Sequence, residues 1–203
     1  MTARTRIART VRLAAVVAAA STFAAASTFA VDDVVVAQLL RNTERAKITH
    51  AVVGHEPMAL GSTVRLAVEI EMLPGMHVNA NPPTYDWLIP VEVSLAGADG
   101  VSVIEAFYQE AESRKFPYDD EPYLVYEGTF LIGLLLAVDA DIPAGGRELE
   151  VILGYQACND EACFAPTKTS FKLPIMIVSD AADSVEVSSA ILDRAPFPRE
   201  RER

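Results

Sequence analysis

The feature that most constrains this chain is an alternation of apolar and polar residues that begins near residue 47 and returns in run after run. Residues 64–72 read Val-Arg-Leu-Ala-Val-Glu-Ile-Glu-Met. A period of two places alternate side chains on one face of an extended strand, which is typical of half-buried antiparallel structure. Similar runs, separated by turn residues, occupy 48–53, 89–95, 101–104, 124–138, 147–155 and 169–178. We therefore predict an all-β domain, a β-sandwich of about seven or eight short strands without an internal helix.

One connection between these runs is longer and more polar than the others. Residues 108–122 are rich in Asp, Glu, Lys and Arg and carry Phe116-Pro117-Tyr118 near their centre. Long loops inside a compact domain are often lids or binding loops. We predict a polar loop with an aromatic tip formed by Phe116 and Tyr118.

The first thirty residues have the pattern of a secretory signal peptide. A basic stretch without acids precedes an apolar core at 13–20, and small residues lead up to Ala26 and Ala30, the two expected cleavage positions. The alternative, an uncleaved anchor, is disfavoured because the apolar run is shorter than the ~20 residues of a spanning helix. We expect an exported, periplasmic protein that is not inserted in the membrane after cleavage.

The rest of the chain divides into three parts. Residues 31–45 are a linker or a short helix, 46–179 the β-domain, and 180–203 a mostly disordered tail. The net charge is −11, and it becomes −15 without residues 1–30, which hold four arginines and no acid. This charge argues against binding to nucleic acid or to an anionic membrane. A single hydrophobic core fits a domain of this length, and we expect a monomer.

The chain has two cysteines, Cys158 and Cys163, in the connection between the runs 147–155 and 169–178. A hairpin-like connection can bring them within the Cα separation of about 4.4–6.8 Å that a disulfide requires. A ring this small would contribute only about 2 kcal/mol to stability. The residues alone leave two readings open, an inert structural disulfide and a pair that exchanges with other thiols.

Other chemistry has less support. A structural zinc site needs four Cys or His ligands, and the three histidines have no paired spacing with the cysteines. Copper could use Met72, Met76 and His77, but methionines on a strand usually fill the core. No serine-hydrolase motif is present. We predict no metal and no cofactor, and we expect Asp160 and Glu161 to raise the pKa of the neighbouring thiols.

The cysteine block resembles a known family. Residues 155–166 read Tyr-Gln-Ala-Cys-Asn-Asp-Glu-Ala-Cys-Phe-Ala-Pro, and with 76–83, 88–90 and 125–128 they resemble the N-terminal periplasmic domain of the thiol:disulfide interchange protein DsbD. The resemblance covers roughly residues 46–178. The best-known members have one more residue between the cysteines.

The resemblance implies an immunoglobulin-like fold and a redox pair. Such a pair accepts electrons from a membrane thiol reductase and passes them to periplasmic thioredoxin-like proteins, including disulfide isomerases and cytochrome c maturation thioredoxins. Cys163 matches the cysteine that forms mixed disulfides, and Cys158 matches the resolving one. Phe116 matches the phenylalanine of a cap loop that shields the pair, with Tyr118 as the competing residue.

Two functions follow from these patterns. The first is thiol:disulfide interchange, as a component of a protein-disulfide reductase system. Since the 203 residues contain no membrane or thioredoxin module, we expect a separate membrane reductase to supply the electrons. The alternative is a non-enzymatic exported interaction module with a structural hairpin disulfide.

Overall fold

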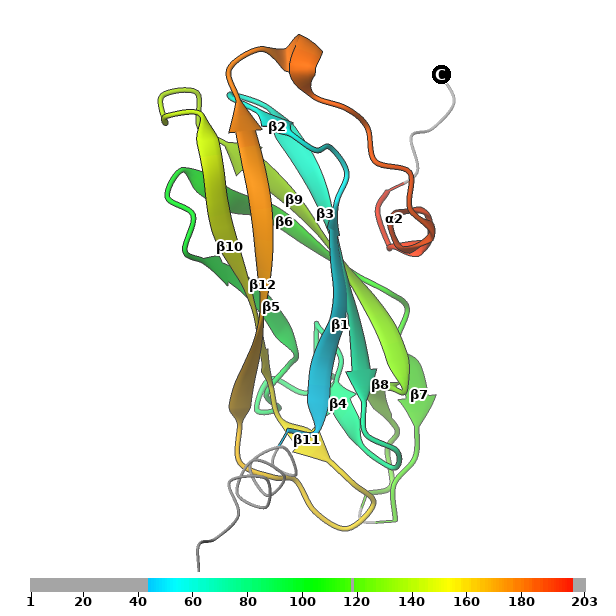
Figure 1. Cartoon of the computed structure of the whole chain (residues 1–203). Coiled ribbons are helices and arrows are strands. Elements are labelled where there is room, and N and C mark those ends of the chain that lie inside the picture. Colours follow the sequence, from blue (N-terminus) through cyan, green and yellow to red (C-terminus); the bar gives the residue numbers. More distant parts are fainter. Residues whose placement is uncertain (1–43, 118, 199–203) are drawn as a thin grey trace, which may run out of the picture.

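The computed structural model describes residues 44–117 and 119–198, and in this part the chain forms an immunoglobulin-like β-sandwich. The predicted signal peptide, nearly all of the 31–45 segment, Tyr118 and residues 199–203 lie outside the described residues. Two four-stranded sheets face each other, and a third, smaller sheet lies at one end (Figure 1).

The first large sheet has the strand order β1-β3-β9-β6 and the second has the order β2-β12-β10-β5. The pairs are antiparallel except β2 with β12. In the first sheet the strands are β1 (Ala46–Val53), β3 (Thr63–Met72), β9 (Thr129–Val138) and β6 (Val101–Tyr108). In the second they are β2 (Met58–Ala59), β12 (Thr167–Val178), β10 (Gly145–Tyr155) and β5 (Glu92–Ala96).

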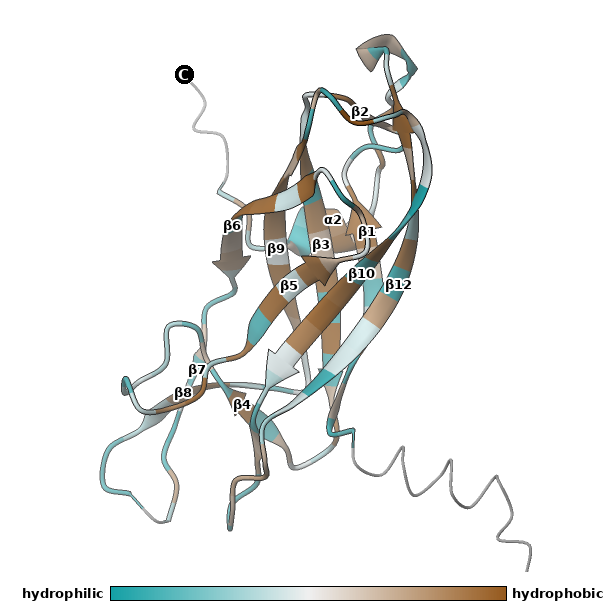
Figure 2. Ribbon diagram, turned by 90° about the vertical axis from the view of Figure 1, so that its left-hand side faces the viewer, coloured by the Kyte–Doolittle hydropathy of each residue, from teal (hydrophilic) through white to brown (hydrophobic). Residues whose placement is uncertain are grey.

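The predicted alternation builds the core between these sheets. Along β10, Leu149, Val151, Leu153 and Tyr155 are buried while the residues between them are partly exposed. The strand β9 buries Phe130, Ile132, Leu134, Leu136 and Val138, and Leu131 and Gly133 on its other side are buried as well. In Figure 2 brown, apolar stretches are frequent along the strands and interrupted by polar ones, as the alternation requires. The all-β prediction is confirmed.

The small sheet has the order β11-β4-β8-β7 and contains β11 (Ala157–Cys158), β4 (His77–Asn79), β8 (Tyr123–Glu127) and β7 (Glu112–Arg114). The predicted run 124–138 is divided between two sheets, because Gly128 has a φ of 58° that turns the chain from β8 into β9. The predicted polar loop 108–122 also contains β7, which pairs with β8. Both departures place strands beside the cysteines.

The expectation of a mostly disordered tail is wrong for residues 180–198, which we call the C-terminal segment. It contains a short 3₁₀ turn, η1 (Ala181–Asp183), and a helix, α2 (Ala190–Arg194), whose N-cap Ser189 accepts a hydrogen bond from the Ile191 amide. Leu192 and Ala195 are buried against Ala67 on the outward face of β3. The segment is ordered because it covers small apolar residues of a sheet face.

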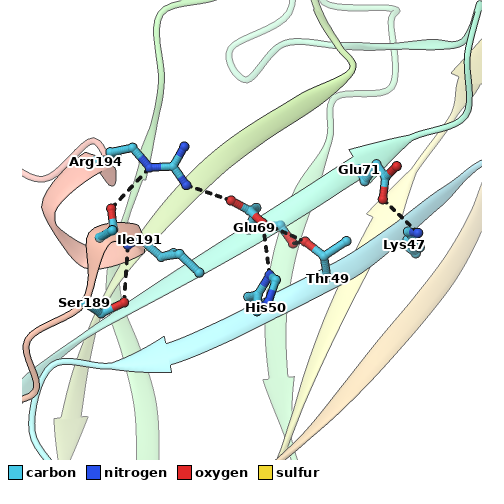
Figure 3. A network of polar contacts seen from close by, with 9 residues as sticks. Lys47, Thr49, His50, Glu69, Glu71, Ser189, Ile191 and Arg194 are labelled. Carbon is cyan, nitrogen blue, oxygen red and sulfur yellow. Dashed lines mark hydrogen bonds and ion pairs between the residues drawn. The ribbon is translucent and has the colours of Figure 1, made fainter.

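Two further contacts fix this segment. The Phe197 ring lies over Gly133 of β9, where an added Cβ would come within 2.8 Å of the ring. Arg194 pairs with Glu69 of β3 at 2.9 Å, and Glu69 also bonds Thr49 and His50 of β1 (Figure 3). Burial raises the pKa of Glu69, but hydrogen bonds from His50, Thr49 and Arg194 more than offset this, so the pKa is lowered.

Candidate functional site: the cysteine pair and its cavity

Cys158 and Cys163 lie opposite each other in the loop of residues 156–164, which we call the cysteine loop. They form a disulfide and an isolated antiparallel bridge, with a Cα–Cα distance of 4.0 Å. The bridge follows from the local sequence, because β11 ends at Cys158 and the chain returns after a four-residue turn.

Backbone hydrogen bonds close the cysteine loop independently of the sulfur atoms. The Asn159 amide donates to the Ala162 carbonyl at 2.9 Å, and the Phe164 amide donates to the Ala157 carbonyl at 2.9 Å. The Asn159 side-chain oxygen also accepts from the amides of Glu161 and Ala162, at 3.0 and 2.8 Å. Asparagine suits this position because its side chain can satisfy backbone amides two and three residues further on.

The two cysteines differ in exposure. Cys158 is 2% exposed, whereas Cys163 is exposed. Exchange through a mixed disulfide needs one accessible cysteine, and Cys163 is the exposed one of the pair.

A cavity of about 70 Å³, which we call the cysteine cavity, adjoins the pair. Side chains from three elements and three loops line it. Phe116 reaches it from the predicted polar loop, and Tyr123 comes from β8. The remaining lining residues are His77, Asn79, Trp87, Leu88, Cys158 and Cys163.

Phe116 is only 2% exposed and packs with Tyr123 and Val125 in a small apolar cluster. It therefore lies beside the cysteines, where the resemblance to a cap loop placed it, and its shielding role stays a prediction. Tyr118, the competing residue, is outside the described residues.

His77 is a part of the site that sequence reasoning assigned elsewhere, as a candidate copper ligand. It is 2% exposed, it is the register partner of Cys158 between β4 and β11, and its ring stacks on Phe116 with a centroid distance of 4.4 Å. Burial, with the charge of Arg114, lowers the pKa of His77 to about 4 against the opposing effect of Asp160. The imidazole is therefore neutral at neutral pH.

Arg114 of β7 connects the parts of the site. Its guanidinium pairs with Glu127 of β8, pairs with Asp160 of the cysteine loop at 2.8 Å, and lies 5.1 Å from the centroid of the Phe116 ring. The Asp160 carboxylate, expected to raise the thiol pKa, is thus partly neutralised by this ion pair.

The outer surface beside the two cysteines combines exposed apolar side chains with exposed acidic ones. Trp87, 70% exposed, and Ile89, 40% exposed, line a groove of about 450 Å³. Trp87 and Leu88 line both this groove and the cysteine cavity, so the two adjoin each other. Exposed acidic residues of this end are Asp86, Asp120, Glu121, Asp160 and Glu161.

Within residues 44–117 and 119–198, no group of three or more His, Cys, Asp or Glu side chains is arranged to hold a metal ion. Met72, one of the residues considered for copper, is buried in the main core, and Met76 packs against that core. The part of the chain that the structure describes contains no helix with the length and apolar character of a membrane span.

Neither a protein-family model nor a curated protein sequence matches the chain. Among solved structures, the chain is similar to the reduced N-terminal domain of Neisseria meningitidis DsbD (13% identity, TM-score 0.38), covering 67% of this chain and 90% of that one. It is also similar to the N-terminal periplasmic domain of ScsB from Proteus mirabilis (18%, TM-score 0.40; 62% and 46% covered). A third similar structure is the complex of the DsbD and PilB N-terminal domains from Neisseria meningitidis (13%, TM-score 0.35; 61% and 82% covered).

Proposed function

We propose that this protein is an exported thiol:disulfide exchange domain that passes electrons through Cys158 and Cys163 to thioredoxin-like proteins. The observation that carries the proposal is the unequal burial of the pair, with Cys163 exposed and Cys158 enclosed beside a cavity. A purely structural disulfide would constrain the cysteine loop little further, since backbone hydrogen bonds already close it.

In the proposed reaction, the Cys163 thiolate attacks a disulfide of the partner. A Cys163–partner S–S bond forms, and the partner's own S–S bond breaks to leave one thiolate. Cys158 then attacks the Cys163 sulfur, which re-forms the internal disulfide and releases the partner fully reduced. A membrane thiol reductase, itself a proposal, would return two electrons and two protons to the pair.

The surface around Cys163 supports a protein as the partner. Trp87 and Ile89 are large apolar side chains exposed beside the cysteines. Exposed aromatic residues of this kind are frequent anchors of protein interfaces. The acidic groups nearby favour a partner with neutral or basic residues around its own cysteine.

Trapping tests the assignment directly. Cys158→Ala, incubated with an oxidised periplasmic thioredoxin-like protein, should accumulate a mixed disulfide through Cys163, because the resolving thiol is missing. The matched variant Cys163→Ala should trap far less, since its remaining thiol is buried. A mixed disulfide formed equally by both variants would overturn the roles.

The reduction potential tests the function itself. An exchanging pair should equilibrate with glutathione, whereas structural disulfides usually lie below about −300 mV. A potential below that value, together with no exchange with any thioredoxin-like protein, would favour the non-enzymatic module with a structural disulfide.

A further inference from the structure

We infer that His77 is the general base for the buried cysteine, taking the proton from the Cys158 thiol when Cys158 attacks the mixed disulfide. This inference rests on the proposed function and adds a residue to its mechanism. In the reverse direction the same imidazole returns the proton to the departing Cys158 sulfur.

The first support is position. Cys158 and His77 are direct partners in the antiparallel pair β11–β4. Side chains opposite each other in such a pair lie on the same face of the sheet, with Cβ atoms about 4.5–5.5 Å apart. Both residues are 2% exposed, and both line the cysteine cavity. The imidazole and the Cys158 side chain therefore line the same cavity.

The second support is hydrogen bonding in the cavity. The Asn79 amide donates to the Ile89 carbonyl at 3.1 Å, and the Tyr123 hydroxyl donates to Asp119 at 2.6 Å. In contrast, Nδ1 of His77 is buried and has no hydrogen-bond partner among the described residues. Buried polar atoms nearly always have partners, and exceptions are frequent at functional sites. The cavity also has room for a water molecule, so in the reduced protein the Cys158 thiol can donate a hydrogen bond to Nδ1 directly or through one water.

The third support is charge. A buried thiol ionises poorly, because burial disfavours the thiolate. The charged groups around His77 are Arg114 of β7, Asp160 of the cysteine loop and Glu127, its register partner on β8. Arg114 is engaged by both of these carboxylates. In the disulfide form the pKa of His77 is lowered to about 4, so the imidazole is neutral and holds no second proton before the step. Negative charge that develops on the Cys158 sulfur beside it raises this pKa, because a nearby opposite charge favours the imidazolium.

The step balances as follows. The S–H bond of Cys158 breaks and its proton moves to His77, while the sulfur electron pair forms the Cys158–Cys163 bond. The bond between Cys163 and the partner breaks, and its electron pair leaves on the partner's sulfur. That thiolate then takes a proton, either from the imidazolium or from water.

Stopped-flow oxidation of the reduced protein by 4,4′-dithiodipyridine separates the two cysteines. Attack by Cys163 releases a first thiopyridone at a rate proportional to the reagent concentration. Attack by Cys158 on the mixed disulfide releases a second at a rate independent of that concentration. At pH 7, His77→Phe should slow the second phase by about 100-fold, the lower range for general base catalysis, and should leave the first nearly unchanged.

The pH profile distinguishes proton transfer from a structural role. The wild-type second phase should be nearly constant between about pH 5 and pH 8, since the imidazole is neutral throughout this range. In His77→Phe its rate should rise about tenfold per pH unit, because only the Cys158 thiolate reacts. His77→Gln, which keeps a polar side chain but accepts no proton, should behave like His77→Phe, and free imidazole should restore the rate of His77→Ala.

The matched control is His55→Phe. His55 forms an isolated backbone β-bridge with Glu186 and does not line the cysteine cavity. This variant should leave both phases unchanged. Equal second-phase rates and pH profiles in wild type and His77→Gln would overturn the inference while leaving the proposed function intact. A wild-type protein that exchanges with no thioredoxin-like protein would overturn the proposed function instead.

Discussion

The C-terminal segment and the cysteine end of the molecule are both attached to the same sandwich, but they differ in whether a polar group that contacts the sandwich has a partner. The C-terminal segment fits small residues of the sheet closely, with Phe197 over Gly133 and Leu192 against Ala67. Its Arg194 is paired with Glu69 of β3. At the cysteine end, His77 lines the cysteine cavity and keeps a buried nitrogen without a described partner. The C-terminal segment also borders a hollow, of about 1110 Å³, so the unpartnered nitrogen is what sets the cysteine end apart.

This difference indicates that the C-terminal segment contributes to stability and that the cysteine end serves the exchange reaction. Close packing and paired charges favour one conformation, whereas an internal space and an unpaired polar atom reduce stability unless they serve another purpose. Substitutions in the C-terminal segment should therefore change the free energy of unfolding and leave exchange unaffected, and surface changes at the cysteine end should do the reverse.

The largest expected effect is the pH dependence of stability caused by His77. The pKa of His77 is about 4 in the folded protein, against 6.5 for an unperturbed histidine, which is the value expected in the unfolded chain. Between these values the unfolded chain binds a proton that the folded chain does not, so the free energy of unfolding should fall as the pH falls, by on the order of 3 kcal/mol in total. Urea denaturation from pH 7 to pH 4 measures this, and His77→Phe should flatten the curve in that window. An unchanged slope in the variant would contradict the burial of a neutral imidazole.

The next effect concerns the C-terminal segment. Gly133→Ala adds a Cβ about 2.8 Å from the Phe197 ring, so the ring must move. We expect a loss of about 1–2 kcal/mol in the free energy of unfolding and faster proteolysis near the C-terminus. Phe197→Ala should act similarly, and both variants should exchange disulfides at the wild-type rate. Slower exchange in either variant would show that the C-terminal segment affects the cysteine site and would contradict the separation of the two regions.

A smaller effect is expected from Trp87→Ala at the cysteine end. Loss of this exposed side chain should slow exchange with a thioredoxin-like protein by about tenfold, equivalent to about 1.4 kcal/mol. Reduction by dithiothreitol and thermal stability should stay unchanged. Val185→Ala removes another exposed apolar side chain, from the C-terminal segment, and should affect neither rate. If both variants slowed exchange equally, the loss would come from any exposed apolar side chain, and Trp87 would have no particular role in docking the partner.

The smallest effect is expected from Arg194→Gln. The arginine side chain is 60% exposed, so its ion pair with Glu69 should contribute no more than about 0.5–1 kcal/mol. Because salt screens exposed pairs, the difference from wild type should shrink in 1 M NaCl. A loss above about 2 kcal/mol would mean that the pair fixes the whole C-terminal segment.

Much of the fold was predictable because the strands bury one face. The alternation in 64–72 and 147–155 is local, and it gave strands close to β3 (Thr63–Met72) and β10 (Gly145–Tyr155). The predicted disorder of residues 180–198 is wrong because the order of this segment has no local pattern. Its order depends on Ala67 and Gly133, which are distant in sequence and become a binding face only once the sheet has formed.

The site was predictable in part for the same reason. Cys158 and Cys163 are close in sequence, so their pairing is a local property. The place of His77 depends on the register between β4 and β11, which are nearly 80 residues apart and lie in a small sheet that no periodicity indicates. In the sequence His77 stands out only beside Met72 and Met76, as a disfavoured copper ligand, and no pattern there indicates that it meets Cys158.

The hydrogen bonds that close the cysteine loop have a consequence for the reduced protein. With the Asn159–Ala162 and Ala157–Phe164 contacts in place, breaking the S–S bond should leave both thiols facing each other on an unchanged backbone. Each would then experience the other at a very high effective concentration, since no chain entropy has to be lost before they meet. A mixed disulfide on Cys163 would thus be short-lived, and a bound partner would be released quickly.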